Sequence, residues 1–127
     1  MKLLTHAQRA TLLRNGRRQA AVKGTTDEID FWPVVKLFTP DGGCTWLLTE
    51  LDPEDEDIAW GLCDLGMGFP EFGTVSLREL EAVRGQLGLP VERDLHFRAR
   101  GPISAYIDAA NQAEHIVEQI TPVANAP

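Results

Sequence analysis

The sequence contains little cysteine, little histidine and no long apolar run, and each shortage excludes a class of protein. A transmembrane helix requires about 18 or more consecutive apolar residues, and no stretch here comes near that length. The first residues pass at once into polar positions, without the apolar core or small-residue cleavage site of a secretory signal. We therefore expect a cytoplasmic protein with no membrane partner. Cys44 and Cys63 form no Cys-x-x-Cys pair, so buried free thiols are expected in a reducing compartment.

Motifs for cofactors, metals and phosphates are also missing. No Gly-Lys-Ser/Thr, no Gly-x-Gly-x-x-Gly at a strand-to-helix turn and no Gly-x-Ser-x-Gly occurs. His6, His96 and His115 are scattered, without the spacing of a zinc site. We predict no cofactor and no metal.

Length and composition indicate one globular domain over residues 1–127. The hydrophobic fraction of 43% and the charged fraction of 24% are ordinary values, so disorder of the whole chain is not expected. A chain of 127 residues buries enough surface to fold without metal or disulfide support.

The first half of the chain predicts a helix followed by a β-hairpin. Thr5 and Gln8 have the spacing of a capping box, and Asn15-Gly16 is a natural helix stop, which predicts a helix over about 6–15 within a basic N-terminal segment of about 1–24. Residues 34–51 predict a hairpin, because two apolar strand-like runs flank Pro40-Asp41-Gly42-Gly43.

The second half predicts shorter elements. We expect strands over 58–63, 74–75 and 94–98, helices over 77–84 and about 103–119, and a frayed tail over about 121–127. Short strands with tight connections favour an α+β fold: a small, mainly antiparallel sheet of four to five strands with about three helices packed on it.

Charge is distributed unevenly along the chain. The net charge is −7, yet residues 1–26 carry six Lys and Arg and no acid, so the remaining 101 residues hold all 19 acids. The basic segment, which contains Arg9, Arg14, Arg17 and Arg18, has no interleaved aromatic residues, and the acidic body would repel phosphates. Duplex binding is therefore disfavoured, and docking of this segment onto the acidic body is the alternative.

The densest acidic cluster is a predicted loop over 52–57, with Asp52, Glu54, Asp55, Glu56 and Asp57. An EF-hand calcium loop needs Gly at its sixth position and Glu at its twelfth. Counting from Asp52, these positions hold Asp57 and Cys63, so the EF-hand pattern fails. We favour a solvated connection, with a partner-facing acidic patch as the alternative.

An apolar loop follows at 65–72, with Met67, Phe69 and Phe72, and Trp60 lies shortly before it. Exposed methionine and aromatic residues often mark contact surfaces. A small domain needs its large apolar residues inside, so we expect this loop to fold back and close the core.

Only one combination of residues suggests catalysis. His96 could approach Cys63 or Asp64 if the strands that carry these residues are neighbours. The side chains could then form a pocket for nucleophilic chemistry. A strand histidine with a satisfied hydrogen bond is the favoured interpretation.

Several segments together resemble a known bacterial family, domain of unknown function 2958. The resemblance runs from Met1 to about Val117, and no segment in it is a catalytic signature. It is carried by Met-Lys-Leu-Leu-Thr at 1–5, Pro-Val-Val-Lys-Leu-Phe at 33–38, Thr-Trp-Leu-Leu-Thr-Glu-Leu at 45–51, Gly-Leu-Cys-Asp-Leu-Gly at 61–66, Val-Ser-Leu-Arg-Glu-Leu at 75–80 and Pro-Val-Glu-Arg-Asp-Leu-His-Phe at 90–97.

The resemblance implies a small accessory protein of plasmids and other mobile elements, and it implies no mechanism. Our hypothesis is a non-enzymatic protein-interaction module that modulates host defence or conjugation through an acidic surface. The alternatives are a small enzyme that uses a Cys/Asp/His pocket, and a protein that contacts nucleic acid through its basic N-terminal segment.

Overall fold

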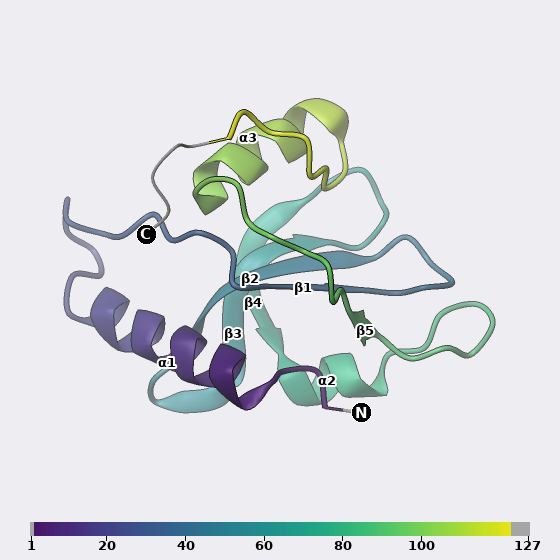
Figure 1. Cartoon of the computed structure of the whole chain (residues 1–127), viewed down its shortest axis with the longest axis horizontal. Helices are drawn as coiled ribbons and strands as arrows, with labels where there is room; N and C mark the ends of the chain where they lie inside the picture. The colour runs from purple at the N-terminus through teal and green to yellow at the C-terminus, as the bar shows by residue number, and fades with distance from the viewer. Residues whose placement is uncertain (1, 123–127) are drawn as a thin grey trace.

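A five-stranded antiparallel sheet lies between helices on both of its faces (Figure 1). The computed structural model describes residues 2–122. The strands are β1 (Val35–Phe38), β2 (Thr45–Asp52), β3 (Asp55–Asp64), β4 (Glu71–Ser76) and β5 (Glu92–Arg93), in the spatial order β4-β3-β2-β1-β5. The helices are α1 (His6–Ala20), α2 (Leu77–Ala82) and α3 (Ile103–Ala113). The predicted α+β class is confirmed.

Two apolar clusters fill the two sides of the sheet. On the side of α1 and α2, Leu12 packs with Leu48 and Leu77. On the side of α3, Leu47 and Leu62 pack with the helix. Leu47 and Leu48 are neighbours in β2, so the alternation of side chains along one strand supplies both cores.

Helix α1 begins where the sequence predicts and continues past its expected end. The Thr5 side chain accepts from the Gln8 backbone and the Gln8 side chain accepts from the Thr5 backbone, which confirms the capping box. The predicted stop at Asn15-Gly16 is wrong, because both residues are buried against β2. The Asn15 amide donates to the carbonyl of Thr49 at 3.0 Å, and a Cβ on Gly16 would overlap the carbonyl oxygen of Leu51.

The predicted hairpin over 34–51 is confirmed, with β1 and β2 paired from Phe38 and Thr45 to Val35 and Leu48. The predicted acidic loop over 52–57 is wrong. β2 and β3 form a second hairpin joined by two residues, so Asp55 to Asp57 belong to β3.

The elements after β3 differ in length from those predicted. β4 begins at Glu71 rather than Thr74, and α2 ends at Ala82 rather than residue 84. The strand over 94–98 is wrong, because the Asp94 carboxylate accepts from the backbone N–H of His96 and turns the chain after β5.

Helix α3 also ends earlier than predicted. It stops at Ala113, where Glu114 takes a left-handed φ of 64° that cannot continue a helix. Of the expected tail, residues 121 and 122 have no regular structure and 123–127 lie outside the described residues.

Candidate functional site

Cys63, Asp64 and His96 do not form one pocket. Cys63 and Asp64 end β3, whereas His96 follows β5, and β2 and β1 lie between those two strands. Three strand spacings correspond to about 14 Å, far beyond hydrogen-bond reach. The neighbouring strands that a thiol–imidazole pair would require are absent from the described sheet.

Cys63 and Asp64 have separate structural surroundings. Burial, and then the charge of Glu71, raise the pKa of Cys63 to about 11, so the thiol stays protonated at neutral pH. The buried Asp64 carboxylate accepts from the backbone N–H of Gly66 at 2.8 Å and of Ile116 at 2.9 Å. Asp64 therefore ties the end of β3 to the segment that follows α3.

Three of the acidic residues at the β2–β3 turn accept hydrogen bonds from nearby groups. Asp52 accepts from the backbone N–H of Glu54 at 2.8 Å. Asp57 accepts from the hydroxyl of Ser76 and the backbone N–H of Arg78, and these two bonds, in that order, lower the pKa of Asp57. Asp55 accepts from the backbone N–H of Asp57, whereas Glu54 and Glu56 are exposed.

Trp60 and Phe72 pack against each other on adjacent strands. Their ring centroids lie 6.1 Å apart, and the Lys23 ammonium lies 3.9 Å from the centre of the Trp60 ring. Trp60 is half-buried, so this pair belongs mainly to the packing between β3, β4 and the chain after α1.

The connection between β3 and β4 projects its apolar side chains into solvent. Met67 is 70% exposed and Phe69 is 80% exposed. The expectation that this loop folds back onto the core is wrong. Gly66 and Gly68 adopt φ values of 78° and 85°, which turn the chain tightly, while Leu47 and Leu62 already fill the core beneath α3.

A second apolar loop, between α2 and β5, lies at the same end of the sheet (Figure 1). Leu87 is 81% exposed, and its backbone N–H donates to the Asp41 carboxylate at 2.6 Å. Asp41 lies in the β1–β2 turn, whose Gly43 contacts Gly66 of the β3–β4 loop. Three loops are thus joined into one surface, which we call the apolar end. Its exposed side chains are Leu65, Met67, Phe69, Leu87 and Leu89.

Acidic side chains border the apolar end. Glu71 is exposed at the start of β4, and a Glu114 carboxylate oxygen would lie 4.0 Å from a Cβ on Gly68. β3 separates this end from the acidic β2–β3 turn by ten residues, about 30 Å of extended chain. The acidic turn and the apolar loop therefore form two different surfaces.

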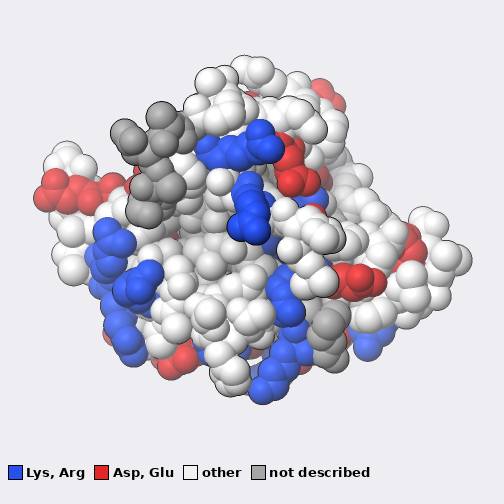
Figure 2. Space-filling view, viewed as in Figure 1, with Lys and Arg blue, Asp and Glu red and all other residues white. Residues whose placement is uncertain are grey.

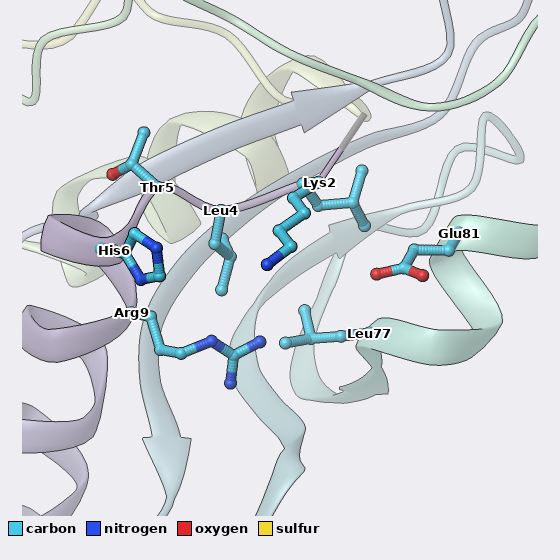
Figure 3. A pocket seen from close by; sticks show the side chains of 8 residues that line it. Lys2, Leu4, Thr5, His6, Arg9, Leu77 and Glu81 are labelled. Atoms are coloured by element: carbon cyan, nitrogen blue, oxygen red, sulfur yellow. The ribbon is translucent and has the colours of Figure 1, made fainter.

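The predicted basic residues all lie on α1. Arg14, Arg17 and Arg18 are exposed, and Figure 2 shows Lys and Arg side chains along this helix and in the middle of the same face. Arg9 lies in a separate cavity of about 470 Å³ at the start of the helix. Figure 3 shows Lys2 and Arg9 directed into this cavity above Leu77, opposite Glu81.

The charged side chains that line the cavity at the start of α1 are mainly basic. Its titratable residues are Lys2, His6, Arg9 and Glu81. Acid–base catalysis requires groups placed within hydrogen-bond reach of a common substrate atom, and no such pair is formed here among the described side chains.

Glu50 is a buried carboxylate that the sequence analysis missed. It lies in β2, where the pairing with β3 changes register between Leu48 and Glu50. Glu50 lines two surface hollows, one together with Phe72 and the other together with Lys23. Burial raises the pKa of Glu50, while the nearby charge of Lys23 opposes that shift. A single acid inside an otherwise apolar strand is the signal that could have indicated it.

No group of three or more His, Cys, Asp or Glu residues in the range 2–122 is arranged to hold a metal ion. No helix in the same range combines the length and the apolar character needed to cross a membrane.

Comparison with known proteins identifies one family. The family described as protein of unknown function (DUF2958) matches residues 3–117, nearly the full length. The chain belongs to this family. Most of the segments that indicated the resemblance lie in the sheet of this DUF2958 protein: 33–38 contains β1, 45–51 lies in β2, 61–66 contains the end of β3 and 90–97 contains β5. Segment 75–80 joins the end of β4 to the start of α2. No curated protein and no solved structure matches the chain.

Proposed function

We propose that this DUF2958 protein is a non-enzymatic interaction module that docks onto a protein partner through its apolar end. The observation that carries the proposal is the exposure of Met67 and Phe69 on the β3–β4 loop and of Leu87 on the α2–β5 loop, two loops that both lie against the β1–β2 turn. Soluble monomers rarely leave large apolar side chains grouped in solvent unless the group serves a contact.

Burial of these side chains would supply substantial binding energy. Each large apolar side chain removed from water contributes about 1.5–3 kcal/mol. Interfaces obtain most of their affinity from a few such central residues. The loops are held by Asp41 and by the Gly43–Gly66 contact, so little ordering cost is added on binding.

Charge indicates the chemistry of the partner. Glu71 and Glu114 border the apolar end, and the chain carries a net charge of −7. Complementary potentials speed association and like charges slow it. The partner we propose is therefore a different protein, with an apolar cleft bordered by Lys and Arg, rather than a second copy of this chain.

The biological setting belongs to the same proposal. We propose a cytoplasmic accessory protein of a mobile element, the setting that the family resemblance implies, which would modulate a host-defence or conjugation component. An acidic border could compete with nucleic acid for a basic surface of such a component.

The enzyme alternative has less support. It requires a base within reach of Cys63, and the sheet order separates His96 from that thiol. A protonated thiol without a base is a weak nucleophile.

A matched pair of variants tests the docking surface. Met67→Gln, Phe69→Gln and Leu87→Gln would be combined in one chain, and Glu54→Gln with Glu56→Gln at the opposite end of β3 would serve as the control. Each would be purified from its native host at physiological salt and its co-purifying proteins quantified. We expect one protein to bind the wild type and the control but not the triple variant. Equal recovery with the triple variant, or recovery of nothing by the wild type, would contradict the proposal.

A further inference from the structure

A groove on the basic face combines free guanidinium groups with aromatic residues from another part of the chain. It has a volume of about 470 Å³ and lies between α1 and the segment 29–34. Arg14 and Arg18 line one wall, Phe31 and Trp32 line the other, and Ala99 lies at the far side. The sequence could not show this arrangement, because the aromatics lie 13 or more residues from Arg18.

The arginines of the groove are available to an anion. Within residues 2–122, the ion pairs to carboxylates involve only Lys36, so neither Arg14 nor Arg18 is neutralised. Arg18 lies over the Phe31 ring, with its guanidinium carbon 5.5 Å from the ring centre, which holds the charge at the groove. Positive charge also continues past the groove, because the exposed Arg98 and Arg100 flank Ala99.

Asp30 is the one acidic residue that lines the groove, and its carboxylate is hydrogen-bonded to Ser104. Both carboxylate oxygens of Asp30 accept from Ser104, one from the backbone N–H and one from the hydroxyl. Ser104 lies in the first turn of α3, where backbone N–H groups offset negative charge. Figure 2 shows this face with Lys and Arg side chains on both sides of an uncharged depression.

We propose that this groove binds a short segment of single-stranded nucleic acid. The half-buried Trp32 provides a face on which a base can stack, Arg14 and Arg18 contact its phosphates, and Arg98 and Arg100 continue the track along the backbone. A duplex does not fit this chemistry, because its bases are already stacked and unavailable to Trp32. The inference does not depend on the apolar end, which is formed by other residues.

The test is a titration of the full chain with a fluorescent oligothymidylate of about 12 nucleotides, read by anisotropy at low salt. Arg14→Ala, Arg18→Ala and Trp32→Ala each remove one contact, and Trp32→Phe keeps an aromatic face in case the alanine variant fails to fold. Arg17→Ala is the matched control, since it removes the same charge from the same helix without lining the groove.

We expect Trp32→Ala to weaken binding about tenfold or more, Trp32→Phe to bind close to the wild type, and both groove arginine variants to weaken binding more than Arg17→Ala. Affinity should fall steeply with added salt. Four results would overturn the inference: no binding at low salt, an equal loss with Arg17→Ala, tighter binding of a duplex, or equally tight binding of a mononucleotide, which would indicate a nucleotide pocket instead.

Discussion

The Asp41 carboxylate in the β1–β2 turn accepts a hydrogen bond of 2.6 Å from the backbone N–H of Leu87, 46 residues further along the chain. The same oxygen accepts from Leu89 at 3.3 Å. A Cβ on Gly85 would overlap this carboxylate, so only glycine permits the approach. One acid in a tight turn thus fixes the loop that places Leu87 in the apolar end.

Removing that carboxylate should release the loop without unfolding the sheet. We expect Asp41→Ala to lower the free energy of unfolding by about 1–3 kcal/mol, the range for loss of a hydrogen-bonding partner. Amide hydrogen exchange at Leu87 and Leu89 should speed up. Asp27→Ala, at an exposed position, is the control and should change neither quantity. Unchanged exchange in Asp41→Ala would show that the loop is held by other contacts.

Gly16 should be intolerant of alanine although it lies inside a helix. An exposed helix interior gains up to about 1 kcal/mol from Gly→Ala. Here the new methyl group would overlap the Leu51 carbonyl, so we expect Gly16→Ala to cost about 1–3 kcal/mol in denaturant unfolding. Gly73→Ala in β4 is the control, because its Cβ would meet nothing within 4 Å. If the Gly16→Ala variant were stabilised, the close approach of α1 to β2 at this position would be contradicted.

Cys63 should react slowly with alkylating reagents. With its pKa raised to about 11, only about one thiol in a thousand is ionised at pH 8. We expect iodoacetamide to label Cys63 far more slowly than an unperturbed thiol, with the rate still rising above pH 9. Quantitative mass spectrometry of the peptide that contains Cys63 measures this. Fast labelling that levels off near pH 7 would instead favour the enzyme alternative.

Glu50 should make stability depend on pH in a direction opposite to that of most acids. Its pKa is raised by burial, so the folded state holds its proton more tightly than the unfolded state. Stability from this group is complete below the unfolded pKa of about 4.3 and is lost as pH rises through the folded pKa. Urea unfolding of Glu50→Gln should therefore show a gain over the wild type that grows from pH 4 to pH 7. A constant difference would contradict the raised pKa.

The sequence was a good guide to local structure and a poor one to distant contacts. Thr5 with Gln8 and the turn at 40–43 predicted a helix start and a hairpin, because both signals act over a few residues. Asn15-Gly16 carries the same kind of local stop signal, yet contacts with β2, more than 30 residues away, keep the helix intact.

The apolar end and the groove also depend on contacts between distant parts of the chain. Met67 and Phe69 were identified from the sequence, but their exposure depends on how much core α3 already fills. The sequence gives no sign that Leu87 belongs to the same surface, because its place there depends on the hydrogen bond from its backbone N–H to Asp41. Trp32 and Arg14 are joined only by the packing of α1 on the sheet. Such associations are properties of the tertiary fold, which a single sequence does not reveal.

Crosslinking in the living host would show whether the apolar end docks on another protein. A photoreactive phenylalanine analogue would replace Phe69 in one chain and Glu56, at the opposite end of β3, in another. We expect a crosslinked product with one heterologous protein from position 69 and none from position 56. Products from position 56 alone, or from position 69 only with a second copy of this chain, would contradict it.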